Sequence, residues 1–122
     1  MSHQARGFCE ELYELVFQTD NGRVFRSGLD SNVFMIEYGN MFINMNCCNF
    51  NRFTDFLSNT QEEDIKKMIL PSINKIVIQP MKSLGCYAFT LEQFLELRVL
   101  VEESRQIAKI QNEVHHILNS KK

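Results

Sequence analysis

Two adjacent cysteines, Cys47 and Cys48, are the first residues of this chain to consider for chemistry. They stand where an expected β-hairpin runs into an expected short helix, and a thiol near a helix N-terminus can have a lowered pKa and raised reactivity. The sequence places no histidine close to them, and alternation along the strand directs one of the two side chains inward as a small apolar group. We expect structural thiols, with a reactive or redox-sensing role as the alternative.

Glu113 and His116 are three residues apart, a spacing that puts both side chains on one helix face, as in the half-sites of di-iron helical bundles. Such a centre needs carboxylates from neighbouring helices, and the sequence has no second Glu-x-x-His motif. Lys109 and Asn112 share this polar side of the helix, and His115 is no better placed. We interpret these histidines as a solvated helix end near a favourable dipole and expect no metal or cofactor.

Recognised catalytic motifs are missing from the sequence, which has no G-x-S-x-G, no P-loop and no dinucleotide fingerprint. The sequence has only three histidines, few residues from which to build a catalytic triad or a histidine-based metal centre. We expect that the protein is not an enzyme. A group of amides beside apolar side chains could form a small recognition surface, although turn and cap chemistry is their commoner role; its members are Asn44, Asn46, Asn49, Asn51, Phe42 and Met35.

Length and composition bound the class of protein. A chain of 122 residues suits a single domain, here 1–122 with flexible ends expected at 1–8 and 120–122. The 44% of hydrophobic residues indicates a globular chain with a core, and the net charge of −2 argues against a binder of nucleic acid or of membrane surfaces. The polar N-terminus lacks the apolar segment of a secretory signal, so we expect a cytoplasmic protein with reduced cysteines.

Two β-hairpins are predicted in the first half. Gly39-Asn40 can form a type II′ turn, and this register places Phe34, Ile36 and Tyr38 opposite apolar partners on one face and leaves a mixed second face. Asn21-Gly22 is a strong two-residue turn signal and would pair Asp20 with Arg23. A helix over residues 10–17 is the alternative to the first strand, although the β-branched and aromatic residues there favour a strand.

Two short helices and two strands follow. Asn49 is the expected N-cap of the first helix, and Thr60 with Glu63 forms the expected capping box of the second, which Pro71 ends. Residues 73–79 and 86–89 are the expected strands. A further capping box, Thr90 with Gln93, opens a long helix that runs to about Asn119.

The long C-terminal helix is about 45 Å long if it is straight, which exceeds the roughly 35 Å diameter of a compact domain of this size. Its first half is broadly apolar, whereas its second half carries a narrow apolar stripe of Ile107, Val114 and Leu118, flanked by Ile110 and Ile117. A polar stretch over 102–106 separates the two. Either the helix breaks there and folds back on the core, or its end meets a partner along the stripe.

A resemblance to known sequences rests on short segments: Asn21–Val24, Tyr38–Asn40, Phe53, Phe56-Leu57, Ile76–Ile78, Phe89-Thr90 and Glu96-Leu97. In these the chain resembles an uncharacterised family of short Bacteroidota proteins, a domain of unknown function. Members often carry a C-x-x-C motif after the first hairpin, where this chain has Ser27–Ser31 without cysteine. The resemblance therefore implies a shared fold and carries over no metal or redox role.

Together these patterns predict an α+β domain, with antiparallel hairpins covered on one face by helices and a long C-terminal helix. The predicted function is a non-enzymatic protein-interaction or regulatory module that forms a homodimer, or binds another protein, through the stripe on that helix. The alternative is a protein that binds a small apolar ligand in a pocket lined by Phe and Met, of which the chain has ten and six.

Overall fold

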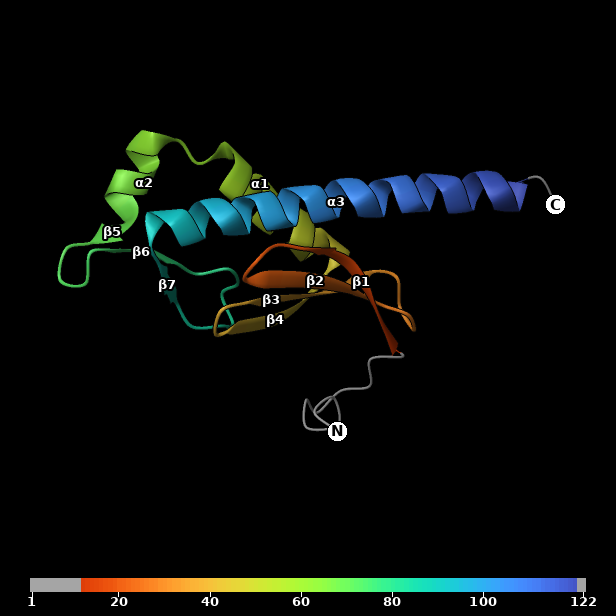
Figure 1. Ribbon diagram of the computed structural model, residues 1–122, viewed down its shortest axis with the longest axis horizontal. Coiled ribbons are helices and arrows are strands. Elements are labelled where there is room, and N and C mark those ends of the chain that lie inside the picture. Colours follow the sequence, from red (N-terminus) through yellow and green to blue (C-terminus); the bar gives the residue numbers. More distant parts are fainter. Residues whose placement is uncertain (1–11, 121–122) are drawn as a thin grey trace.

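The computed structural model describes residues 12–120 and confirms the α+β class. A four-stranded antiparallel sheet has the order β1-β2-β3-β4, and a small second sheet has the order β5-β6-β7. Three helices complete the fold, and the longest of them, α3 (Leu91–Ser120), lies over the first sheet and projects beyond it (Figure 1). Of the two ends expected to be flexible, 1–8 and 121–122 lie outside the described residues, whereas Ser120 belongs to α3.

The hairpin of β3 (Val33–Tyr38) and β4 (Met41–Asn46) has the predicted register. Tyr38 pairs with Met41, Ile36 with Ile43, and Phe34 with Met45. Gly39 has a φ of +55°, which the first position of a type II′ turn requires and which a side chain would disfavour. Alternation and turn chemistry therefore agree on one pairing.

The first hairpin joins β1 (Tyr13–Gln18) to β2 (Gly22–Ser27), so the strand interpretation is correct and the helix alternative is wrong. The predicted pairing of Asp20 with Arg23 is also wrong, because Gln18 pairs with Arg23 and the loop spans 19–21. The register shifts between Leu15 and Phe17. This bulge lets the adjacent Val16 and Phe17 both pack on the core, which strict alternation would forbid.

Helix α1 (Cys47–Asn59) has its N-cap three residues before the expected one. The N-cap is Asn46, whose side chain accepts a hydrogen bond of 2.8 Å from the backbone N–H of Asn49, so Asn49 lies inside the helix. Helix α2 (Glu62–Met68) is likewise capped at Gln61 rather than at Thr60, with the Asp64 carboxylate accepting from the Gln61 N–H. Several neighbouring polar side chains can accept hydrogen bonds from the free backbone N–H groups at the start of a helix. Sequence spacing alone does not decide which of these side chains becomes the N-cap.

The second sheet contains β5 (Ile69–Leu70), β6 (Lys75–Ile78) and β7 (Tyr87–Phe89). The last two correspond to the expected strands, which are shorter than predicted, and β5 was not expected. Buried Ile76, Ile78 and Phe89 join this sheet to the main core.

The core lies between the first sheet and the helices α1 and α3. Its centre is fully buried and comprises Ile36, Tyr38, Met41, Phe50, Leu57, Phe94, Leu97 and Leu100. Most Phe and Met side chains that could have lined a cavity thus fill the interior instead. The second face of the sheet is mixed, as predicted, with Asn44 exposed and Arg23 paired with Glu37 at 2.6 Å, although Phe25 and Met35 are buried there.

Candidate functional site

Helix α3 begins at the predicted capping box, in which the Gln93 N–H donates to the Thr90 hydroxyl and the Thr90 N–H donates to the Gln93 side chain. It continues without a break through 102–106. In this stretch Ser104 is fully buried and its hydroxyl donates to the Leu100 carbonyl at 2.6 Å, so the helix stays on the sheet although the sequence becomes polar. The alternative in which the helix folds back is therefore wrong.

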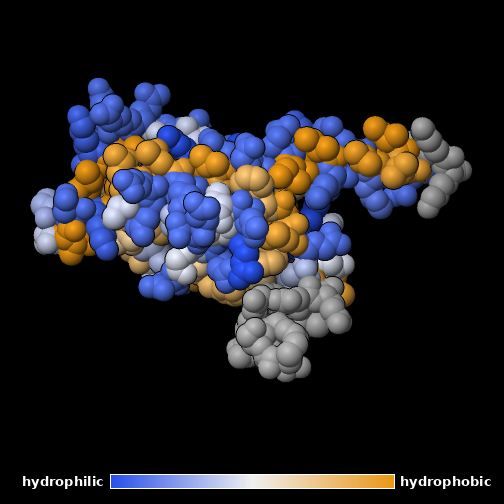
Figure 2. All heavy atoms as spheres, in the orientation of Figure 1, coloured by the Kyte–Doolittle hydropathy of each residue, from blue (hydrophilic) through white to orange (hydrophobic). Residues whose placement is uncertain are grey.

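The side chains at the distal end of α3 are not buried against the rest of the domain. Every residue from Lys109 to Asn119 is exposed, and Figure 1 shows that α3 continues past the edge of the sheet. The apolar side chains of the predicted stripe are about half exposed, from 48% at Ile110 to 59% at Leu118, and Ile107 at its start is partly buried. Figure 2 shows apolar residues gathered along this projecting end.

The stripe faces in a different direction from the buried side of α3. Successive residues of an α-helix are rotated by about 100°, which places the centre of the stripe about 120° around the axis from the buried residues. Those buried residues are Phe94, Leu97, Leu100, Val101, Ser104 and Ala108. The stripe therefore does not face the sheet side of α3, and only a surface outside this domain can cover it.

The two adjacent cysteines lie in the first turn of α1 and have different environments. Cys47 is partly buried against the core and accepts a 3.6 Å contact from the Asn51 side chain, whereas Cys48 is exposed. The expectation that one of them points inward is confirmed. Cys47, Cys48 and Cys86 are all free thiols.

The other residues with suggestive spacing do not converge. Glu113, His115 and His116 are exposed on the projecting end of α3, and His115 contacts Asn119 on the same helix at 2.8 Å. Within residues 12–120 no group of three or more His, Cys, Asp or Glu side chains is arranged to hold a metal ion. Of the clustered amides, Asn46 caps α1 and Asn51 contacts Cys47, so these two have structural roles.

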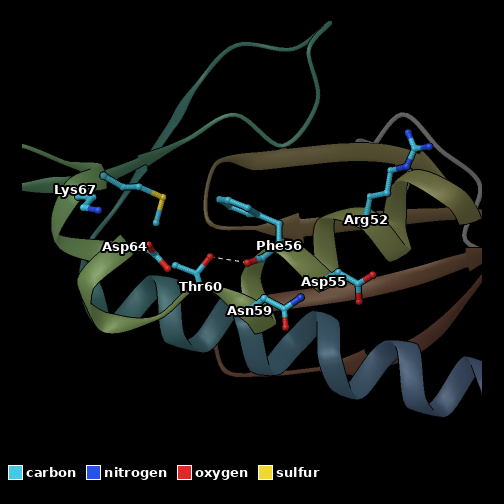
Figure 3. Close-up of a pocket in the computed structure, with 8 residues that line it drawn as sticks. Arg52, Asp55, Phe56, Asn59, Thr60, Asp64 and Lys67 are labelled. Atoms are coloured by element: carbon cyan, nitrogen blue, oxygen red, sulfur yellow. Dashed lines mark hydrogen bonds between the residues drawn. The ribbon is translucent and has the colours of Figure 1, made fainter.

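One hollow lies between α1 and α2, with a volume of about 540 Å³. Helix α1 supplies Arg52, Asp55 and Phe56 to it, and α2 supplies Asp64 and Lys67 (Figure 3). Its two acidic and two basic side chains balance, and it is open to solvent. It shows no preference for a ligand of either charge.

A second hollow, of about 240 Å³, lies beneath α3 where the end of the sheet and the start of α1 meet. Three cationic side chains line it: Arg26 from β2 and Arg105 and Lys109 from α3. Its apolar wall contains Phe34 and Phe50, whose rings stack with their centroids 4.5 Å apart. It contains two phenylalanines and no methionine, so it resembles the expected Phe- and Met-lined pocket only in its position between sheet and helix.

The cations of this second hollow were missed at the level of sequence. Arg26 lies about 80 residues before Arg105 and Lys109, and no local spacing connects them. The one local signal is that Lys109 and Asn112 share a polar side of the helix, and the sequence alone predicts that this side faces solvent. The structure turns that side toward β2, where Asn112 accepts a 2.6 Å hydrogen bond from Arg26.

A hydrogen-bond network ties the start of α3 to the sheet. The Glu96 carboxylate accepts from the Tyr38 hydroxyl at 2.8 Å and from both the backbone and the side chain of Asn21 at 2.9 Å. Partial burial alone would raise the pKa of Glu96, but the hydrogen bonds from Asn21 and Tyr38 outweigh it and hold the pKa at about 2. Three residues that carry the resemblance, Asn21, Tyr38 and Glu96, therefore meet in a contact that holds the fold together.

Within the described residues, no helix is both long enough and apolar enough to cross a bilayer. Comparisons with protein-family models, with curated proteins and with solved structures find no match to this chain.

Proposed function

We propose that this protein is a non-enzymatic interaction module that forms a homodimer through the projecting end of α3. The observation that carries the proposal is the direction of the stripe, about 120° away from the buried face of the same helix. A half-exposed aliphatic stripe that its own domain does not cover is typical of an interaction surface.

The spacing of the stripe indicates which partner it fits. Ile107, Ile110, Val114 and Ile117 follow one another at intervals of three, four and three residues, the a and d positions of two heptads. Such a seam packs best against another helix with the same spacing, and a second copy of α3 provides one. Most of the described Phe and Met side chains are buried, so they offer little exposed apolar surface to a partner.

The exposed area indicates the size class of the expected interface. The stripe offers on the order of 400 Å² of apolar surface per copy, about half of the roughly 800 Å² per partner in a standard interface. We therefore expect a weak dimer that forms at high protein concentration and dissociates on dilution. Free thiols at Cys47, Cys48 and Cys86 support placing this protein in a reducing compartment such as the cytoplasm.

The test is the mass of the native protein by sedimentation equilibrium over a dilution series. We expect twice 14.3 kDa at high concentration for the wild type and a monomer for Val114→Asp at every concentration. The matched control is His116→Asp, an exposed position about 150° around the same helix from the stripe, which should remain dimeric. A wild-type monomer throughout, or equal weakening by both substitutions, contradicts the proposal.

A further inference from the structure

The hollow beneath α3 combines features that the dimer does not explain. It is formed by three parts of the chain: the end of the first sheet, the first turns of α1, and α3 near the point where this helix leaves the sheet. Its residues on α3 include Arg105, Lys109 and Asn112, which face the side of the helix opposite the stripe. A second copy packed along the stripe would therefore leave the hollow open.

Only one of the three cations that line the hollow forms an ion pair within the described residues. Arg105 forms an ion pair of 2.6 Å with Asp55. Arg26 has no acidic partner among the described residues, since its guanidinium donates only to the Ser31 carbonyl, to Asn112 and, at 3.5 Å, to Gln111. Arg26 and Lys109 thus form no ion pair within residues 12–120, although Glu14 lies opposite Arg26 on β1 and Glu113 follows Lys109 by one helical turn.

The guanidinium of Arg26 is held in place with donors to spare. Its Nε donates to Ser31 at 2.9 Å, one terminal nitrogen donates to Asn112 at 2.6 Å, and the planar group lies 5.4 Å from the centre of the Phe34 ring. Both terminal nitrogens keep an N–H group without a close acceptor among the described residues. An arginine fixed in this way is arranged for an oxyanion, which its remaining N–H groups can bind.

Lys109 is free to complete the site. Its side chain forms no hydrogen bond and no ion pair within the described part of the chain, and its position on the wall of the hollow lets its ammonium group move toward an anion held by Arg26. The amide of Asn51 on α1 also lines the hollow. Polar donors thus converge from the sheet, from α1 and from α3.

The size and the wall of the hollow define the rest of the ligand. A volume of about 240 Å³ corresponds to roughly eight water molecules at ~30 Å³ each, enough for a ligand about as large as a substituted benzene ring. Phe34, Phe50 and Ala108 form an apolar wall beside the cations. This pairing of an apolar wall with a few converging charged groups is typical of small-molecule sites.

We propose that the hollow beneath α3 binds a small organic oxyanion, a carboxylate or phosphate attached to a compact apolar group. Arg26 and Lys109 bind the anionic end, and Phe34, Phe50 and Ala108 contact the apolar end. The site is independent of dimerisation, because the two surfaces lie on opposite sides of α3.

The test is a titration of ¹⁵N-labelled wild-type protein with phenyl phosphate and with benzoate, followed by amide chemical shifts. Expected is a saturable shift centred on Asn51, Ala108 and Lys109 with at least one of the two probes, which also identifies the preferred anion. Inorganic phosphate carries the anion without the apolar group, and benzyl alcohol carries the apolar group without the anion. Each should bind about tenfold more weakly than the preferred probe or not at all. Inorganic phosphate binding as tightly as phenyl phosphate, or shifts centred elsewhere, would overturn the proposal.

Two variants and a matched control make the assignment specific. Arg26→Gln should weaken binding about tenfold and Lys109→Gln several-fold. Since the Lys109 side chain is exposed and forms no hydrogen bond or ion pair within the described chain, its substitution should leave the fold intact even if Arg26→Gln destabilises it. Arg52→Gln removes the same charge from an exposed position on α1 and should leave the affinity unchanged. Equal weakening by Arg52→Gln and Lys109→Gln would mean diffuse attraction rather than a site, and would overturn the proposal.

Discussion

The hydroxyl of Tyr38 donates a 2.8 Å hydrogen bond to the Glu96 carboxylate, and this contact joins the end of β3 to the second turn of α3. Asn21, in the loop between β1 and β2, donates to the same carboxylate from its backbone and from its side chain. The Glu96 carboxylate thus gathers three segments that are up to 75 residues apart in the sequence. It fixes the place where the long helix meets the sheet.

Stability should depend on pH through Glu96. Its pKa of about 2 in the folded protein lies below the ordinary value of 4.5, so ionised Glu96 stabilises the fold above pH 4.5 and this contribution is lost as the pH falls toward 2. Because the carboxylate is partly solvent-exposed, we expect a loss of about 1–2 kcal/mol rather than the full amount that the shift implies. Urea denaturation at several pH values measures it.

The variant Glu96→Gln isolates this contribution. It should lower the free energy of unfolding by about 1–2 kcal/mol at pH 7 and should flatten the decline between pH 4.5 and 2. Glu92→Gln, an exposed glutamate in the first turn of the same helix, is the control and should keep the wild-type pH profile. A Glu96→Gln profile parallel to that of the wild type would show that Glu96 is not responsible.

Substitution of Gly22 should be strongly destabilising. A Cβ atom at this position would lie 2.6 Å from the Tyr38 ring and 2.7 Å from the Leu100 side chain, and both of these residues are fully buried. We expect Gly22→Ala to cost about 2–3 kcal/mol, because a packed core cannot move aside without strain. Gly85→Ala is the matched control, since a Cβ there meets no atom within 4 Å, and it should leave stability almost unchanged. Thermal or urea unfolding of the two variants compares them directly.

Removing the projecting end of α3 should separate folding from association. A chain that ends at Lys109 loses the exposed residues 110–119 together with the hydrogen bonds from Arg26 to Gln111 and Asn112, and it keeps the whole core, so its unfolding temperature should fall by a few degrees. The same truncation removes Ile110, Val114, Ile117 and Leu118, and the protein should then be monomeric at every concentration. Circular dichroism checks the fold and sedimentation checks the mass; an unfolded product would show that the end of the helix is required for the core.

The thiols should react in the order of their exposure. In a Cys9→Ser background, we expect a maleimide to modify exposed Cys48 and Cys86 before partly buried Cys47. Mass spectrometry with peptide mapping gives the three rates, and the urea-unfolded protein provides the reference. Labelling of Cys47 faster than a model thiol would instead support the reactive-thiol alternative.

The resemblance to the uncharacterised Bacteroidota family stays a prediction, but the structure gives its short segments a physical meaning. Gly22 admits the close approach of Tyr38 and Leu100, and Asn21, Tyr38 and Glu96 bond to one another. Such residues specify how a helix docks on a sheet. Their presence in another chain would therefore indicate the same fold and would say little about its ligands.

Local patterns in the sequence determined a large part of this fold. The pairing of β3 with β4 followed from alternation and from Gly39, because a shift of one residue would turn every apolar side chain to the other face. The start of α3 followed from Thr90 and Gln93, whose reciprocal hydrogen bonds depend only on a spacing of three residues. The helical period likewise identified the apolar stripe that begins at Ile107.

Tertiary structure alone decided the features that depend on distant residues. The bulge in β1 exists because the core accepts both Val16 and Phe17, which no local period reveals. The rotation of α3 about its axis was set by packing on the sheet, and it determined that the stripe faces away while Lys109 and Asn112 turn toward Arg26. Sequence spacing fixes which residues share a helix face, but only packing fixes which way that face points.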